Sequence, residues 1–182
     1  KSYHGTSTEL TCTARIVKHG ESDINVYTLE RAISNDMKQS ATAQNLKMNV
    51  TYALPDGSNP LAKAIDQGEE IQITVQIENE SLVDLDDMAL SVKMPSGWEL
   101  LNPRIFESAK LINDGFVYQD FKDDRVYTYF TMGKSGAAKI KTYRFKARAQ
   151  LKGHFYLPAV AVTDMYNLDV QAQSLSHRVT VK

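Results

Sequence analysis

The sequence predicts an all-β protein, an antiparallel β-sandwich of about seven strands. Apolar and polar residues alternate with a period of two in most segments from Asn45 onward, as in strands with one buried face. Turn-forming residues separate these segments, and the segments lack the unbroken apolar runs that are typical of a parallel sheet. Short alternating strands between turns are typical of two packed antiparallel sheets.

Each predicted strand shows this alternation between recognisable end signals. The first strand buries every second residue from Leu46 to Tyr52 and ends before the turn sequence Pro-Asp-Gly at residues 55–57. Pro95, which cannot donate to a central ladder, ends the third strand. By the same reasoning we expect strands at residues 46–52, 71–77, 88–94, 126–132, 143–151, 155–162 and 178–181.

The first part of the chain, residues 1–44, is less regular. Glu9–Val17 and Ile24–Leu29 are candidate strands, and a weak helical spacing follows. That spacing is interrupted by Ser, Asn and Asp, which favour turns. We therefore expect residues 1–44 to be an extended, partly ordered segment, compatible with the tail of a preceding domain. Residues 45–182 are expected to form the sandwich.

Composition and charge exclude several classes of function. The chain has 182 residues, with 42% apolar and 24% charged residues, as in ordinary soluble globular proteins. Its formal net charge of −1 provides no field that favours nucleic acid or an anionic membrane. No apolar run reaches the roughly 18 residues of a membrane-spanning helix. Because the chain starts at Lys1, we expect it to be a fragment of a larger protein.

Residues that could carry catalysis or bind a metal are sparse. The single cysteine, Cys12, cannot form a disulfide within the chain; a small buried apolar residue is favoured over a reactive thiol. The histidines show no spacing that places two of them on one face, and we expect them in turns or on the surface: they are residues 4, 19, 154 and 177. We therefore expect no enzymatic activity, no metal and no cofactor.

Two acidic clusters are candidate sites. Asp84, Asp86 and Asp87 superficially resemble a calcium loop, but the turn glycine and closing Glu are missing, so a solvated hairpin is favoured. Asp123-Asp124-Arg125 is expected to form a turn in which Arg125 pairs with one carboxylate. An enzyme would need two carboxylates such as Asp120 and Asp124 to converge, which nothing in the periodicity indicates. Two matches to the N-glycosylation pattern, at Asn49 and Asn79, arise often by chance.

Three stretches, in this order, carry a family resemblance. Met88–Arg104 contains Pro-Ser-Gly-Trp-Glu followed by Asn-Pro-Arg, Asp120–Phe130 contains Asp-Asp-Arg-Val, and Asp164–Ser174 contains Met-Tyr-Asn. Together with flanking strands, residues 45–182 resemble the C-terminal macroglobulin-like domain, the tenth of its type, of the bacterial α2-macroglobulins. These are large cell-envelope proteins that trap proteases. The resemblance implies a macroglobulin-type, immunoglobulin-like β-sandwich.

The resemblance also implies a role for one loop. In family members with a Cys-x-Glu-Gln thioester in an upstream domain, the C-terminal domain packs on the thioester domain, and a Met-Tyr-Asx-Pro loop shields the thioester from water. Met165, Tyr166 and Asn167 match this loop. Leu168 replaces the usual proline, and Gln171 stands where the family tends to have an arginine. The alternative for Met165 and Tyr166 is that they plug the end of the sandwich or simply face solvent.

The expected partners follow from the same resemblance. They are the thioester domain and neighbouring macroglobulin-like domains of the parent chain and, through the parent, target proteases, with no nucleic acid and no direct membrane insertion. The implied location is the periplasm or cell envelope. The alternative function is an immunoglobulin-like adhesion or scaffold module of a cell-surface protein, binding protein or carbohydrate through its loops.

Overall fold

The computed structural model describes residues 38–106 and 115–182, together with a few positions near the N-terminus. The chain divides into two compact units, Lys1–Ile33 and Ser34–Lys182, and the second contains every strand described below. Cys12, His4 and most of the two N-terminal strand predictions, Glu9–Val17 and Ile24–Leu29, lie outside the described residues.

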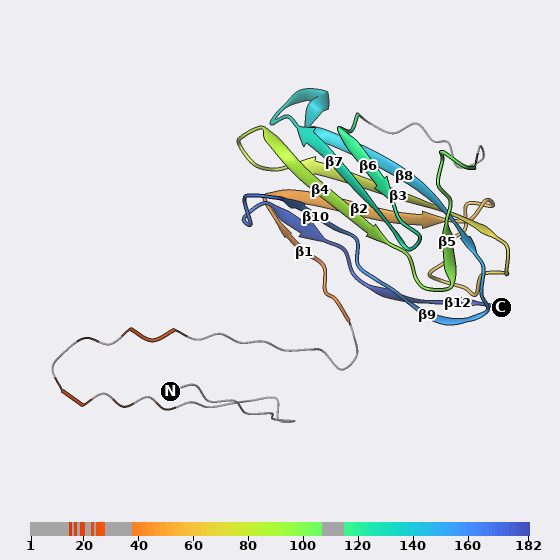
Figure 1. The fold of residues 1–182 in the computed structure, drawn as a ribbon, viewed down its shortest axis with the longest axis horizontal. Coiled ribbons are helices and arrows are strands. Elements are labelled where there is room, and N and C mark those ends of the chain that lie inside the picture. The colour runs from red at the N-terminus through yellow and green to blue at the C-terminus, as the bar shows by residue number, and fades with distance from the viewer. Residues whose placement is uncertain are drawn as a thin grey trace. The chain divides into compact units, whose positions relative to one another are not determined.

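One layer of the second unit is a six-stranded antiparallel sheet (Figure 1). Its strand order is β1-β11-β10-β4-β7-β6. The strands are β1 (Thr42–Gln44), β4 (Leu85–Lys93), β6 (Tyr118–Phe121), β7 (Arg125–Met132), β10 (Ala161–Asp164) and β11 (Gln171–Gln173).

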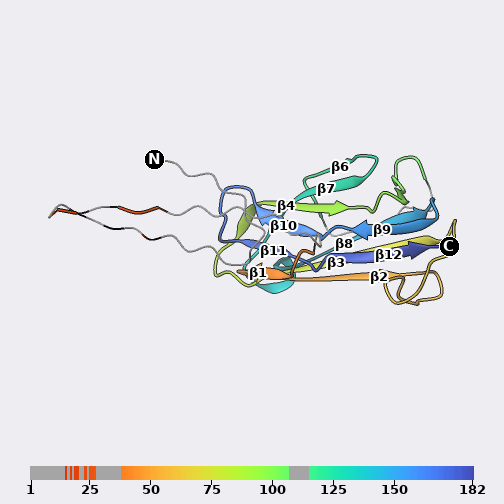
Figure 2. The same cartoon turned by 90° about the horizontal axis from the view of Figure 1, so that it is seen from below.

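The other layer is a four-stranded antiparallel sheet of order β2-β3-β8-β5, and a two-stranded sheet of β9 and β12 accompanies it. A short 3-10 helix, η2 (Gly136–Lys139), precedes β8. Figure 2 shows the two layers edge-on. The strands are β2 (Leu46–Ala53), β3 (Glu70–Asn79), β5 (Trp98–Leu100), β8 (Ile140–Ala149), β9 (Gly153–Leu157) and β12 (His177–Val181).

The core lies between the two layers and is built by the alternation seen in the sequence. Every second residue of β3 from Ile71 to Ile77 is fully buried, and β7 buries Val126 and Phe130 from the other layer. The rings of Phe130 and Tyr143 meet with centroids 5.1 Å apart, which joins β7 to β8 across the core. The all-β, antiparallel prediction is therefore confirmed.

The predicted number of about seven strands is wrong, because the described residues alone form strands β1 to β12. Strands β1, β5, β6 and β11, of three or four residues each, are too short to show a period in the sequence. The predicted strand 155–162 is two strands, β9 and β10, which belong to different sheets. Pro158 lies between them and lacks the N–H group that a continuous ladder needs. Strand β8 ends at Ala149, so Leu151, predicted inside it, is exposed.

The passage from β1 to β2 transfers the chain from one layer to the other. Strand β1 pairs with β11 and β2 pairs with β3, so the single residue between them, Asn45, makes the change. Asn45 has a positive φ of 56°, which asparagine tolerates better than most residues. The division into residues 1–44 and 45–182 stays a prediction, and residues 44 and 45 lie at the passage from β1 to β2.

Candidate functional site

The loop of residues 165–170, which joins β10 to β11, contains all three residues that the family resemblance singles out. It begins after Asp164, a buried residue at the end of β10. One oxygen of its carboxylate, Oδ1, accepts the backbone N–H groups of both Tyr166 and Asn167, each at 2.9 Å. This is an Asx-type turn, in which a side chain replaces a backbone acceptor and sets the direction of the loop.

Further hydrogen bonds close the loop at its base. The N–H of Asp164 donates to the carbonyl of Val170 at 2.9 Å, and Val170 N–H donates to the carbonyl of Asn167 at 3.1 Å. The side-chain amide of Gln171 donates to the carbonyl of Leu168 at 2.9 Å. The position of the family's arginine therefore holds an amide that fastens the loop internally.

The loop is also fastened to the rest of the sandwich. Met165 N–H donates to the carbonyl of Asp87 on β4 at 2.9 Å. On the other side, the side-chain amide of Asn45 donates to the carbonyl of Asp169 at 2.9 Å. The side chain of Gln44 adds a bond of 3.2 Å to the Asp169 carboxylate. Both flanks of the loop are therefore bonded to neighbouring segments, which restrains its backbone.

The large side chains of this loop point away from the protein. The exposed fraction is 47% for Met165, 82% for Tyr166 and 77% for Leu168. None of the three contributes to the core between the sheets. Asn167 has a different role, because its Oδ1 accepts the N–H of Asp169 at 3.1 Å and so shapes the turn. The loop is thus a rigid frame that presents two apolar side chains and one aromatic side chain to solvent.

Sequence reasoning missed two residues on which the loop depends, Asp164 and Asn45. The sequence does carry a signal for Asp164. An aspartate two and three residues before Tyr166 and Asn167 has the usual spacing of an Asx turn, in which its side chain accepts their backbone N–H groups. Asn45 carries no such signal, because its contact with Asp169 joins residues far apart in the sequence.

The carboxylates of the acidic cluster at residues 84–87 do not converge on one point. Asp84 Oδ1 accepts the backbone N–H of Lys134 at 2.8 Å, while Asp86 and Asp87 lie at the start of β4. In residues 38–106 and 115–182, no three potential ligands come together in a group that could hold a metal ion. The hairpin predicted here is wrong, because the connection before β4 comes from β3, which belongs to the other layer.

The second acidic cluster is paired as predicted. Arg125 donates to both carboxylate oxygens of Asp124, from Nε at 2.8 Å and from Nη2 at 2.6 Å. The guanidinium holds the pKa of Asp124 below its usual range, mainly through this hydrogen bonding. Asp120 pairs separately with Lys122 at 2.9 Å, which raises the pKa of that lysine. The two carboxylates considered for an enzyme are therefore each neutralised by their own cation.

The described histidines are spread over the surface. His154 was predicted in a turn but lies in β9, where its Nδ1 is 2.9 Å from the hydroxyl of Thr180 on the paired strand β12. His177 begins β12, and His19 is exposed. No pair of them shares a site with a cysteine or a carboxylate cluster within the described ranges.

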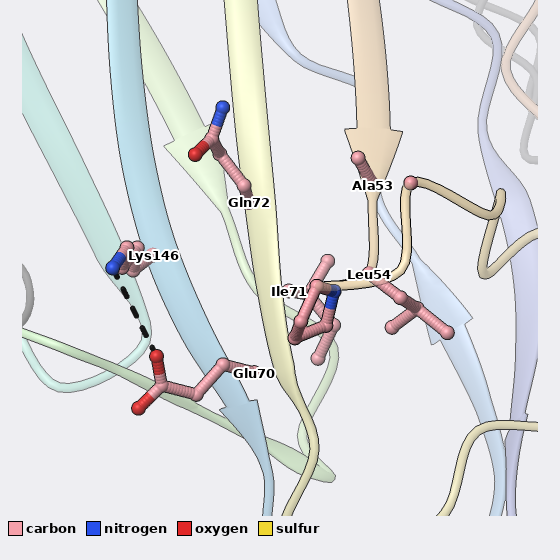
Figure 3. Close-up of a pocket in the computed structure, with 8 residues that line it drawn as sticks. Ala53, Leu54, Glu70, Ile71, Gln72 and Lys146 are labelled. Carbon is pink, nitrogen blue, oxygen red and sulfur yellow. Dashed lines mark ion pairs between the residues drawn. The ribbon is translucent and has the colours of Figure 1, made fainter.

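A hollow of about 310 Å³ lies where β2 ends and the chain turns away from β3 (Figure 3). Leu54 and Ile71 form its apolar part, and Lys146 lies 3.9 Å from the Glu70 carboxylate at its side. Arg148 binds the same carboxylate at 2.9 Å. The lining offers no nucleophile beside a general base, so we assign it no chemistry: it consists of Ala53, Leu54, Pro55, Gly57, Glu70, Ile71, Gln72 and Lys146.

The fold is of the immunoglobulin-like β-sandwich class, with a rigid, outward-facing aromatic loop at one end. Residues 46–168 match the family model of the bacterial α2-macroglobulin MG10 domain. The chain belongs to this family. The family predicted from the three sequence stretches is therefore confirmed.

Solved structures with the same fold include α2-macroglobulins of Salmonella and Escherichia coli. The Salmonella α2-macroglobulin reacted with methylamine is 19% identical, with a TM-score of 0.66 over 79% of this chain and 10% of its own. The native Escherichia coli α2-macroglobulin from domain MG7 to the C-terminus is 17% identical, with a TM-score of 0.66 over 79% of this chain and 25% of its own. The trypsin-activated E. coli protein is 16% identical, with a TM-score of 0.68 over 79% of this chain and 11% of its own.

The matched proteins are much longer than this chain. A curated relative, the circularly permutated Ras protein 2 of Dictyostelium discoideum, is 24% identical over 117 residues, which are 64% of this chain and 3% of that protein. The chain therefore spans a small part of each of these relatives. Across the described ranges, no helix has the length and apolar character required to cross a membrane.

Proposed function

We propose that this chain is the C-terminal docking and locking module of a bacterial α2-macroglobulin-like protease inhibitor of the periplasm or cell envelope. It packs on the thioester domain and neighbouring macroglobulin-like domains of its parent chain. The loop of Met165, Tyr166 and Asn167 shields the thioester from water. The module has no reaction of its own and meets target proteases only through the parent.

The observation that carries this proposal is the combination of rigidity and exposure in the loop. Asp164 fixes the backbone at Tyr166 and Asn167 by two hydrogen bonds, yet the Tyr166 side chain is 82% exposed. A flexible loop could fold its aromatic ring back onto the sandwich, whereas this backbone directs it outward. A surface that presents large apolar side chains on a fixed frame is typical of a docking site.

The side chains suit the proposed task. A tyrosine ring is a rigid apolar plate that can exclude water from a reactive acyl group, and its hydroxyl can donate to a carbonyl oxygen. Because the loop is already ordered, docking loses little additional backbone entropy. Leu168 replaces the family's proline, and here the bonds from Asp164 and Gln171 supply the stiffness that a proline would otherwise give.

The test is a titration of free thiols in the intact parent protein before and after methylamine, which opens a thioester. Cys12 contributes equally to both readings, so only the difference is informative. We expect one new thiol per chain, and a faster spontaneous appearance of that thiol in the Tyr166→Ala parent. If methylamine releases no thiol, or if Tyr166→Ala leaves the spontaneous rate unchanged, the shielding role is wrong.

A matched control is Tyr118→Ala. Tyr118 is also an exposed tyrosine, 53% exposed, but it lies on β6 and stacks on Tyr129 with ring centroids 6.2 Å apart. The Tyr118→Ala parent is expected to keep the wild-type rate of thiol appearance. Specific capture of a glycan or host protein by the isolated chain, together with no effect of Tyr166→Ala, would instead favour an adhesion module.

A further inference from the structure

A second pair of apolar side chains is presented beside the loop of residues 165–170. Leu82 and Val83 lie at the tip of the connection of residues 80–84, which joins β3 to β4. Leu82 is 91% exposed and Val83 is 57% exposed. Neither side chain belongs to the core between the sheets. Adjacent aliphatic residues this exposed on a folded surface call for a reason other than the stability of this chain.

The tip is held rigidly by one buried side chain. Asn79 is fully buried, and its amide nitrogen donates to the carbonyls of Val83 at 2.9 Å and Gly133 at 3.1 Å. Its oxygen accepts the N–H of Ser81 at 2.8 Å and the hydroxyl of Ser81 at 2.6 Å. These bonds occupy Asn79, which removes the glycosylation match noted in the sequence from the surface of the folded chain. They also fix the direction of the tip, as Asp164 does for the other loop.

The tip and the loop are physically linked. Glu80 N–H donates to the carbonyl of Asn45 at 3.1 Å, and the side chain of Asn45 donates to the carbonyl of Asp169 at 2.9 Å. On the other side, Met165 binds Asp87, just inside β4. Both connections project from the same end of the sandwich in Figures 1 and 2, the first yellow-green and the second dark blue. The tip therefore lies at the end of the sandwich that a partner of the Tyr166 loop approaches.

The polar residues around these side chains carry mostly negative charge. Four lysines lie in the described segments at this end: Lys139, bound to Glu78 at 2.9 Å, Lys47, opposite Glu78 on β2, Lys141 at the start of β8, and Lys134 beyond β7. Carboxylates outnumber these lysines, because Glu78 is joined by exposed carboxylates in both connections and at the start of β4: Glu80, Asp84, Asp86, Asp87 and Asp169. A partner that covers the apolar tips would also cover these carboxylates, and burying a carboxylate without a cation is costly. The partner surface should therefore be apolar with basic residues around it.

We propose that Leu82 and Val83 form the second half of one docking surface, together with Met165, Tyr166 and Leu168. Its occupant is the domain of the parent chain that receives the Tyr166 loop, through an apolar patch with a basic rim. This inference rests on the proposed function, because it takes its partner from there. Two rigid contact points fix the orientation of the partner, whereas one loop alone would leave it free to rotate.

The test is hydrogen–deuterium exchange on the intact parent protein, compared with the isolated chain. We expect slower exchange in the parent for both segments, residues 80–87 and 164–170. We also expect Leu82→Ser/Val83→Ser in the parent to speed exchange in residues 164–170 by about tenfold, because losing a buried aliphatic contact weakens docking by roughly that factor. Raising the salt concentration should have the same effect in the wild type, since the rim is electrostatic.

The matched control is Leu151→Ser, because Leu151 is 58% exposed and follows β8 at the opposite end of the sandwich. It should leave the exchange of both segments unchanged. Protection of residues 164–170 without protection of 80–87 would overturn this inference and leave the proposed function intact. Protection of neither segment, or of 80–87 alone, would overturn both. An unchanged melting temperature of the isolated double variant would show that its effect in the parent is not a folding defect.

Discussion

Trp98 and Tyr166 are both aromatic residues in turn motifs that the family resemblance brought forward, yet the structure places them in opposite surroundings. Trp98 follows the Pro-Ser-Gly turn, where its N–H donates to the carbonyl of Pro95 at 2.9 Å, and its side chain is 5% exposed. Tyr166 follows the Asx turn of Asp164, and its side chain is 82% exposed.

The difference comes from Gly97, the residue directly before Trp98, and from Asp164, which stands two residues before Tyr166. Gly97 lies so close to Phe155 that an added Cβ would fall 2.3 Å from the ring, and this close approach packs the turn onto the sandwich. Asp164 instead turns its own carboxylate inward and directs the following side chains outward. One family motif can therefore reflect core packing, while another provides a contact surface. The exposed fraction of the aromatic side chain distinguishes the two cases.

Among the substitutions that test this comparison, Trp98→Ala should have the largest effect on stability. Removing a buried aromatic side chain should lower the free energy of unfolding by about 3–5 kcal/mol. Denaturation of the isolated chain by urea measures this loss. Trp98 Nε1 is buried and has no hydrogen-bond partner among the described residues, so Trp98→Phe loses packing but no hydrogen bond and should cost less than Trp98→Ala. Equal losses in the two variants would contradict a packing role.

Gly97→Ala should have the next largest effect. The new methyl group would overlap the ring of Phe155, so the ring or the turn must move, and overpacking of this kind lowers stability by about 1–3 kcal/mol. Thermal unfolding gives the change. Gly115→Ala is the matched control, because a Cβ at Gly115 meets nothing within 4 Å and the stability should hardly change.

Asp164→Ala should have an intermediate effect that is concentrated in the loop. It removes the acceptor of two backbone N–H groups, which lowers the free energy of unfolding by about 1–2 kcal/mol. Amide exchange in residues 165–170 should rise more than exchange in the core strands. Asp164→Asn keeps an oxygen in the same place and should retain most of the protection. A uniform rise across all strands would mean that the carboxylate supports the fold rather than the loop.

Tyr166→Ala should have the smallest effect on stability, within about 0.5 kcal/mol of wild type, because the side chain is exposed. The melting temperature of the isolated chain is the measurement. A loss of several kcal/mol would show that Tyr166 plugs the end of the sandwich, and the comparison with Trp98 would then fail.

Much of the fold could be predicted because burial of one strand face leaves a period of two in the sequence. The alternation from Ile71 to Ile77 and from Val126 to Met132 matches the buried faces of β3 and β7. The three-residue strands β5 and β11 could not be found this way, since three residues contain hardly more than one period. Pro158 was visible in the sequence, but a proline does not reveal that the chain continues in another sheet.

The sequence could single out the loop of the candidate site, but it could not predict the geometry of that loop. The Met-Tyr-Asn motif located the loop, but local sequence could not show that Met165 binds Asp87 and that Asp169 binds Asn45. The exposed tip at Leu82 was predictable only in part. Asn79 supports it through local bonds to Ser81 and Val83, but the bond from Asn79 to Gly133 joins segments that are distant along the chain.

The pairing of β1 with β11 also has a consequence for the order of events on the ribosome. Thr42 pairs with Gln173, and Ile65 bridges to Val181, so segments made early are completed by segments made more than a hundred residues later. Such long-range pairings slow folding, because the entropic cost of closing a large loop comes before the stabilising contacts form. Until residues 171–181 emerge, strands β1, β9 and β10 lack the partners β11 and β12. Unpaired strand edges are prone to aggregation, so we expect the nascent chain to need protection by chaperones.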